Sequence, residues 1–132
     1  MEGGQTNEFR PLILVAEDDD SNFKLIKAII GKKCDIQWAK NGEEIVALFK
    51  EYGNEAKAIL MDIKMPVMNG LDATKIIRGE NKEIPIIMQT AYAFSSDKEN
   101  AMNAGASEVL VKPITLSILR GTLTKYFPEL VW

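Results

Sequence analysis

The chain contains no histidine among its 132 residues. This absence excludes catalytic triads built on histidine, most zinc sites and any function as a phosphohistidine donor. The single cysteine, Cys34, cannot form an internal disulfide and fits a reducing compartment. Apolar runs of the roughly 20 residues that span a bilayer are missing, and so are the basic and apolar parts of a signal peptide. The formal net charge of −3 gives no argument for nucleic acid or a membrane as a direct partner.

The composition indicates one globular domain. Hydrophobic residues make up 46% of the chain, enough for one packed core, and charged residues make up 27%, an ordinary share for a protein surface. Residues 1–10 are polar and rich in glycine, so we expect a flexible N-terminal segment there. Residues 11–132 are then expected to form the domain.

Short apolar runs alternate with stretches whose apolar residues recur at helical spacing. The runs predict strands at about 12–16, 34–39, 58–61, 85–89 and 109–111. The stretches predict helices containing residues 23–30, 45–49, 71–77, 97–104 and 116–127. This alternation indicates an α/β fold, in which helices cover both faces of a doubly wound parallel sheet. A strand order of 2-1-3-4-5 would place the first and third strands side by side, but spacing alone does not determine that order.

The acidic run Glu17-Asp18-Asp19-Asp20 follows the first predicted strand directly. Carboxylates at the end of a strand suit a hard cation such as Mg²⁺, which prefers oxygen ligands. The alternative is helix capping, because an acidic residue before a helix favours its dipole and accepts its first N–H groups. We favour Glu17 and Asp18 as metal ligands and Asp20 as the cap.

Asp62 follows the third predicted strand, with no cation next to it in sequence. A carboxylate in such a position can attack phosphorus in line and carry the group as an acyl phosphate. Capping of the next helix fits less well, because Lys64-Met65-Pro66 intervenes.

Thr90 and Lys112 follow the fourth and fifth predicted strands. The Thr90 hydroxyl and the backbone N–H of Ala91 could donate to a phosphoryl oxygen, although threonine is also common in strands. An ammonium group at a buried strand end needs an anionic partner, so Lys112 could pair with Asp62 at rest. Pro113 either begins the next helix or takes a cis bond.

Four segments together resemble the receiver domains of two-component response regulators and hybrid histidine kinases. They are residues 13–18, 61–70, 90–91 and 105–113, and the resemblance extends over roughly residues 12–126. It implies the flavodoxin-like (βα)5 fold with sheet order 2-1-3-4-5. It also implies a phosphoryl acceptor that works with Mg²⁺, for which Mn²⁺ can substitute. Such a domain is not a conventional enzyme: it promotes its own aspartyl phosphorylation and slow dephosphorylation.

The resemblance also assigns roles to individual residues. Asp62 would be the phosphoacceptor. The ligands of the cation would be Glu17, Asp18, Asp62 and the backbone carbonyl of Lys64. The groups contacting the phosphoryl group would belong to Thr90, Ala91 and Lys112.

One position departs from the usual family pattern, and two others form a variable pair. Val109 stands where receiver domains usually carry Tyr or Phe, so switching through an aromatic ring is not expected here. Lys64 and Tyr92 lie two residues beyond Asp62 and Thr90, where a long cation and a ring could screen attacking water.

The expected partner is a histidine kinase or a histidine phosphotransfer domain that docks on the first helix around Asn22 and Lys24. A phosphorylation-dependent homodimer is a second expectation. We expect a cytoplasmic location, either as the receiver of a hybrid sensor kinase, which we favour, or as a stand-alone regulator. The rivals are an aspartyl-nucleophile phosphatase, in which Lys64 would stand where such enzymes carry a second Asp, and a flavin carrier or silent adaptor.

Overall fold

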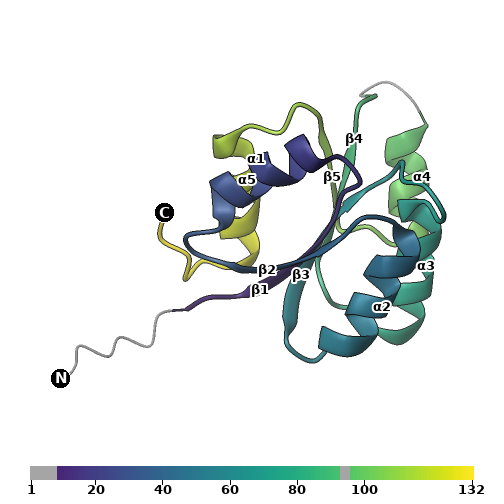
Figure 1. The fold of residues 1–132 in the computed structure, drawn as a ribbon, viewed down its shortest axis with the longest axis horizontal. Helices are drawn as coiled ribbons and strands as arrows, with labels where there is room; N and C mark the ends of the chain where they lie inside the picture. Colours follow the sequence, from purple (N-terminus) through teal and green to yellow (C-terminus); the bar gives the residue numbers. More distant parts are fainter. Residues whose placement is uncertain (1–8, 93–95) are drawn as a thin grey trace.

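The computed structural model describes residues 9–92 and 96–132 and shows a five-stranded parallel sheet (Figure 1). The strands are β1 (Leu12–Ala16), β2 (Asp35–Ala39), β3 (Ala56–Asp62), β4 (Ile86–Thr90) and β5 (Glu108–Val111). Their order is β2-β1-β3-β4-β5, as the family resemblance implied. β1 and β3 are therefore neighbours, and the order reverses beside β1, which is where open α/β sheets bind ligands.

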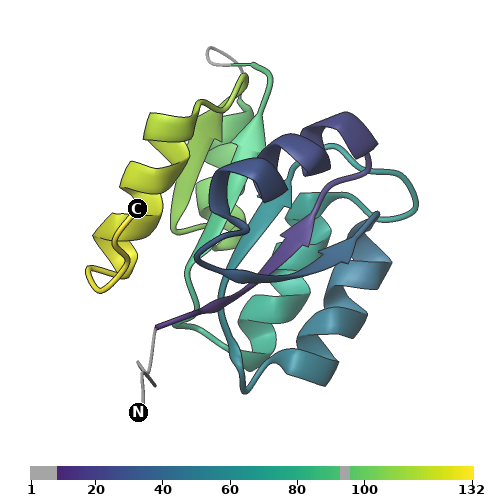
Figure 2. The same ribbon diagram turned by 60° about the vertical axis from the view of Figure 1, so that its left-hand side comes forward.

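Helices cover both faces of this sheet, which confirms the predicted α/β architecture. They are α1 (Asp20–Ile30), α2 (Gly42–Tyr52), α3 (Gly70–Glu80), α4 (Asp97–Ala104) and α5 (Leu116–Tyr126). α1 and α5 pack side by side on one face, and α2, α3 and α4 follow one another on the other (Figures 1 and 2). None of the helices within the described ranges is long and apolar enough to cross a bilayer.

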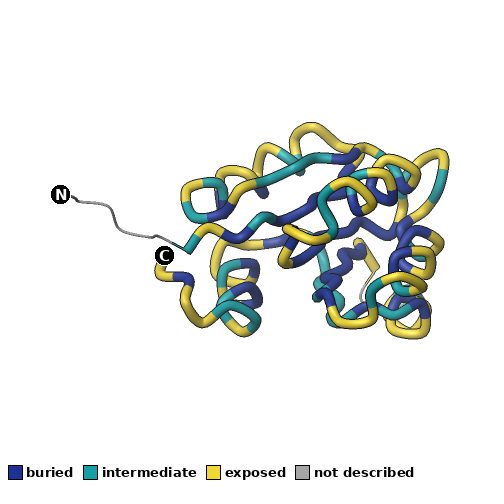
Figure 3. The backbone as a smooth tube through the Cα atoms, turned by 90° about the horizontal axis from the view of Figure 1, so that it is seen from below, coloured by how far each residue is buried: buried dark blue, intermediate teal, exposed yellow. Residues whose placement is uncertain are grey.

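Two apolar cores, one on each side of the sheet, fix the position of the strands. Alternate residues of β1 contribute to each: Ile13 and Val15 pack with α1 and α5, and Leu14 and Ala16 pack with α2 and α3. All four are fully buried. Figure 3 shows buried residues along the strands and exposed residues along the outer sides of the helices.

The ends of several elements differ slightly from the sequence predictions. The N-cap of α1 is Asp19, whose side chain accepts the N–H of Asn22, whereas Asp20 is the first helical residue. The prediction that Asp20 is the cap was therefore wrong. Asp20 instead forms an exposed ion pair with Lys40 at 3.4 Å. The cap of α3 is Asn69, so Asp62 does not serve that role.

Part of the expected N-terminal segment is packed against the domain. Residues 1–8 lie outside the described residues. The ring of Phe9 contacts that of Phe127 at a centroid distance of 6.1 Å. Arg10 donates to the backbone carbonyls of Gly31, Lys32 and Cys34, and so satisfies carbonyls around the end of α1.

Candidate functional site

A polar cleft opens at the carboxyl ends of β1, β3, β4 and β5. Its volume is about 290 Å³, which leaves room for a cation with several waters. The lining residues come from the last residues of β3 and β4, from the segments that follow the four strands and from the start of α1: Glu17, Asp18, Asp19, Asn22, Asp62, Ile63, Lys64, Gln89, Thr90, Ala91, Tyr92 and Lys112. The sheet order thus brings together residues up to 95 positions apart, since the first of them is Glu17 and the last Lys112.

Three carboxylates converge in this cleft. Glu17 is fully buried, Asp62 is 6% exposed and Asp18 is open to solvent. Each offers one oxygen that lies within 4.8 Å of the oxygens of the other two. Because hard divalent cations prefer clustered carboxylate oxygens, this group could bind a metal ion.

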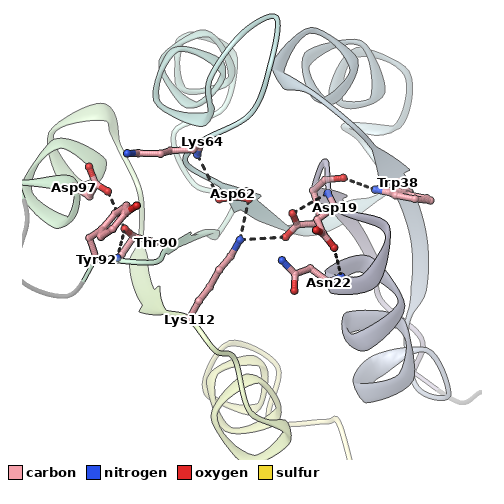
Figure 4. A network of polar contacts seen from close by, with 10 residues as sticks. Asp19, Asn22, Trp38, Asp62, Lys64, Thr90, Tyr92, Asp97 and Lys112 are labelled. Carbon is pink, nitrogen blue, oxygen red and sulfur yellow. Dashed lines mark hydrogen bonds and ion pairs between the residues drawn. The ribbon is translucent and has the colours of Figure 1, made fainter.

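Lys112 places a positive charge beside the carboxylates of the cleft (Figure 4). Its Nζ donates to Asp62 Oδ2 at 2.9 Å and lies 3.6 Å from Glu17 Oε1. Its backbone N–H donates to the carbonyl of Thr90 at 2.8 Å, and the peptide bond to Pro113 is cis. Burial by itself would lower the pKa of Lys112, but the hydrogen bond and the charges of Asp62 and Glu17 raise it above its ordinary value. The ammonium group is therefore charged at rest, and the predicted pairing with Asp62 is confirmed.

Glu17 carries the most perturbed carboxyl of the site. Burial and the nearby charge of Asp62 raise its pKa to about 7, although Lys112 opposes the shift. Among the described residues, its Oε1 is one of the buried side-chain oxygens with no hydrogen-bond partner. A bound cation would satisfy that oxygen and favour the ionised form, so the acidic cluster fits a divalent ion.

This raised pKa predicts a pH-dependent stability of the metal-free protein. A carboxyl whose pKa is higher when folded stabilises the fold below its ordinary pKa of 4.5, and this contribution disappears as the pH rises through about 7. In EDTA, the free energy of unfolding of wild type relative to Glu17→Gln should therefore fall between these pH values. Urea titrations of both proteins across this range measure the difference. If the difference in free energy of unfolding between the two proteins does not change with pH, the raised pKa of Glu17 is contradicted.

Asp62 and Thr90 each have a neighbour at the mouth of the cleft. The backbone N–H of Lys64 approaches Asp62 Oδ1 at 3.4 Å, and Lys64 Nζ lies 4.8 Å from the ring centroid of Tyr92. This cation–π contact spans the cleft between the β3 and β4 loops (Figure 4). Lys64 and Tyr92 therefore border the opening, as their spacing suggested.

Thr90 is buried at the end of β4 and makes two hydrogen bonds through its hydroxyl. The hydroxyl donates to Asp97 Oδ2 at 2.9 Å and accepts the backbone N–H of Tyr92 at 3.1 Å. Thr90 is thus connected to the first residue of α4. Sequence reasoning missed Asp97, because nothing in the spacing of Thr90 and Asp97 indicates which side chain the hydroxyl meets.

A second contact that the sequence did not reveal holds the acidic loop. The indole N–H of Trp38, on β2, donates to the backbone carbonyl of Glu17 at 2.8 Å. The Trp38 ring stacks on that of Phe23, in the first half of α1, at a centroid distance of 3.9 Å. The indole of Trp38 therefore contacts both the loop that carries Glu17 and Asp18 and the helix that follows this loop. Its only sequence signal is an aromatic residue at the end of a predicted strand.

Every residue expected to contact a cation or a phosphoryl group lies in the cleft, together with Lys64 and Tyr92. Val109 lies elsewhere: it pairs with Met88 in the sheet and packs, half-buried, against the core on the α2–α3 side.

Residues 13–124 match the family model described as the response regulator receiver domain. Hybrid signal transduction histidine kinase I of Dictyostelium discoideum is 41% identical over 129 residues, which cover 89% of this chain but 7% of that protein. The chain thus corresponds to a small part of this curated relative.

Solved structures of receiver domains are also similar to this chain. The receiver domain of the sensor histidine kinase PA1611 from Pseudomonas aeruginosa, with a magnesium ion coordinated in its active-site cleft, is 30% identical; the match covers 91% of this chain and 99% of that one, with a TM-score of 0.83. The receiver domain of Ssk1 from Saccharomyces cerevisiae, solved with the histidine phosphotransfer protein Ypd1, is 28% identical at a TM-score of 0.83, covering 92% and 93% of the chains.

Proposed function

Because the chain belongs to the response regulator receiver domain family, we propose that Asp62 accepts a phosphoryl group from a phosphohistidine of a partner protein. The observation that carries this proposal is the position of Asp62, which is held by Lys112 at 2.9 Å inside a cleft with two further carboxylates. A lone buried carboxylate would be protonated or paired structurally. This one faces a polar opening with room for a ligand.

The chemistry needs little beyond positioning and charge neutralisation. An oxygen of Asp62 forms a bond to phosphorus while the phosphorus–nitrogen bond of the phosphohistidine breaks, and the imidazole leaves with its electron pair. Lys112 then pairs with a phosphoryl oxygen instead of with ionised Asp62. The Thr90 hydroxyl and the Ala91 N–H are the donors proposed for the remaining oxygens.

We propose Mg²⁺ as the cation of the acidic cluster, held by Glu17, Asp18, Asp62 and the backbone carbonyl of Lys64. When bound, it would neutralise charge on the phosphoryl oxygens and keep the carboxylates ionised. The unsatisfied Oε1 of Glu17 supports this assignment. Mn²⁺, which takes the same ligands, is expected to substitute.

We propose that the phosphohistidine partner docks beside the cleft. An apolar hollow of about 260 Å³ lies between α1 and the segment after β5, lined by Asn22, Leu25, Ile26, Gln89, Lys112, Pro113 and Ile114. Leu25 is 46% exposed there. Such a surface suits a kinase or phosphotransfer domain, and it includes Asn22 of the surface expected from sequence. We further propose that two copies of the chain pair when Asp62 is phosphorylated. Measuring the oligomer size of the protein with and without acetyl phosphate and Mg²⁺ tests this pairing.

We also propose the kind of protein in which this domain occurs. The 41% identity to part of a hybrid histidine kinase favours a receiver within such a protein, and the alternative is a stand-alone regulator. The free thiol of Cys34 fits the reducing cytoplasm.

The function is tested by incubating the protein with acetyl phosphate and Mg²⁺ and measuring intact mass. Wild type should gain the mass of one phosphoryl group, whereas Asp62→Asn, or wild type in EDTA, should gain none. Asp62→Asn keeps the shape of the side chain and therefore serves as the matched control. Equal uptake by both proteins would refute the proposal, and continuous turnover of a phosphomonoester would favour a phosphatase instead.

The lifetime of the acyl phosphate should depend on the Lys64–Tyr92 contact. Replacing the pair with Ala and Asn removes a cation–π contact of about 0.5–1 kcal/mol at the mouth, so attacking water should enter about twofold to fivefold more often. The decay of the phosphorylated species, followed by mass, gives the rate. Lys82→Ala, an exposed change before β4 at the opposite end of the strand, is the control and should leave the rate unchanged. Equal decay of wild type and the double variant would refute the screening role.

A further inference from the structure

The Thr90 hydroxyl has one proton, and in this structure that proton is already in use. It is donated to Asp97 Oδ2 at 2.9 Å, while the hydroxyl oxygen accepts from Tyr92. A hydroxyl can donate only one hydrogen bond at a time. Thr90 therefore cannot donate to a phosphoryl oxygen on Asp62 without giving up Asp97.

Asp97 occupies a particular place in the fold, since it is the first residue of α4. The residue before it, Ser96, makes no side-chain capping hydrogen bond with the helix. α4 is also short and weakly packed: of its eight residues, only Ala101 and Ala104 are buried. The bond from Thr90 therefore joins the site to the first residue of a helix that buries only two of its eight residues.

Building on the function proposed above, we infer that Asp97 is a positioning residue of the phosphoryl-accepting site. At rest it holds the Thr90 hydroxyl toward α4, and a phosphoryl group on Asp62 replaces it as the acceptor. Phosphoryl uptake then breaks the bond between β4 and α4 and frees the first turn of that helix. The side-chain hydrogen bond of Thr90 leads to α4 rather than to β5, so α4 is the element that responds.

Asp97 and the phosphoryl group compete for one proton, so removing Asp97 should make the site bind a phosphoryl mimic more tightly. A hydrogen bond to a charged acceptor corresponds to roughly tenfold in an equilibrium constant. We therefore expect Asp97→Ala to bind beryllofluoride, in the presence of Mg²⁺, about tenfold more tightly than wild type.

Two matched variants separate the hydrogen bond from other effects. Glu99→Ala removes the same charge from an exposed position in the first turn of α4, and its affinity for beryllofluoride should equal that of wild type. Asp97→Asn keeps an oxygen that can accept from Thr90, so its affinity should lie between those of wild type and Asp97→Ala. A gain in Glu99→Ala as large as in Asp97→Ala would show a general charge effect and overturn the inference.

A double-mutant cycle tests the contact itself. Thr90→Val removes the donor while keeping the shape of the side chain, so in that background Asp97→Ala should no longer change beryllofluoride affinity. If Asp97→Ala tightens binding equally with and without the Thr90 hydroxyl, the inference is wrong. Urea titration of each variant confirms that the proteins compared are folded.

Hydrogen exchange gives a readout that is independent of affinity. Amides of α4 should exchange faster in wild type with beryllofluoride than without it, and in Asp97→Ala they should exchange fast already without it. Unchanged exchange in Asp97→Ala would contradict the inference. Should wild type bind no beryllofluoride, both the proposed function and this inference fail. Should wild type bind it and Asp97→Ala bind it no more tightly, only the inference fails.

Discussion

Replacing Lys112 with Met should slow phosphoryl uptake by Asp62 by about 10²–10³-fold while tightening the binding of Mg²⁺. The ammonium group lies 2.9 Å from Asp62 and 3.6 Å from Glu17, and its charge is the one that meets the incoming phosphoryl oxygens. Methionine keeps the length and the apolar stem of the side chain. The change therefore removes charge with little loss of packing.

The charge of Lys112 also explains why Mg²⁺ binding should change in the opposite direction. A divalent cation among Glu17, Asp18 and Asp62 would be repelled by the Lys112 ammonium group a few ångströms away. Removing a unit charge at such a distance should tighten Mg²⁺ binding by roughly tenfold or more. A purely structural lysine would not produce this pair of opposite changes, because general disorder of the site weakens both functions.

Calorimetric Mg²⁺ titration and the initial rate of mass gain with acetyl phosphate measure the two effects. Lys57→Met, an exposed lysine near the beginning of β3 and far from the cleft, is the matched control and should change neither. Weaker Mg²⁺ binding in Lys112→Met, or an unchanged rate of uptake, would contradict the role given to this residue.

The second large effect is expected at Gly70, the first residue of α3, which lies against the end of β3. A Cβ atom added there would lie 2.1 Å from the backbone oxygen of Asp62 and 3.0 Å from Met61 Cγ. The N–H of Gly70 also donates to the carbonyl of Ile63 at 2.8 Å, so the backbone cannot simply move away. We expect Gly70→Ala to destabilise the fold by about 2–4 kcal/mol and to displace the phosphoacceptor.

The same helix offers a control. A Cβ atom at Gly79, near the other end of α3, would have no atom within 4 Å. Gly79→Ala should therefore stabilise the protein by about 0.5–1 kcal/mol, because alanine loses less backbone entropy in a helix. Urea unfolding of the two variants gives both values. Equal stabilities would show that the close approach of α3 to Asp62 is not a constraint.

The sequence predicted much of this architecture because the fold depends on local patterns. The apolar runs predicted the central strands correctly, and α4 spans the residues that were predicted for it. The helix ends at Ala104 because Gly105, the next residue, adopts a left-handed backbone conformation with φ 115°. The strand order was not contained in any such pattern. It came from the family resemblance, and the sheet topology of the structure agrees with it.

The contacts that sequence reasoning missed are made by side chains that reach from one strand to a different segment of the chain. Trp38 donates across from β2 to Glu17, and Thr90 donates to Asp97 on α4. Both bonds depend on rotamers and on the exact separation of two elements, which residue type and spacing do not specify. The choice between Asp19 and Asp20 as the cap of α1 failed for a related reason, since it depends on where the chain turns from extended to helical backbone.

Reduction of the phosphorylated protein with borohydride, followed by peptide mapping, tests most directly whether Asp62 is the residue that receives phosphorus. Borohydride converts an aspartyl phosphate to an alcohol, and so marks the residue that carried it. We predict a mark on Asp62 alone, present with Mg²⁺ and absent in EDTA. A mark on Asp18 or Glu17 instead, or one that forms equally without the cation, would contradict the account.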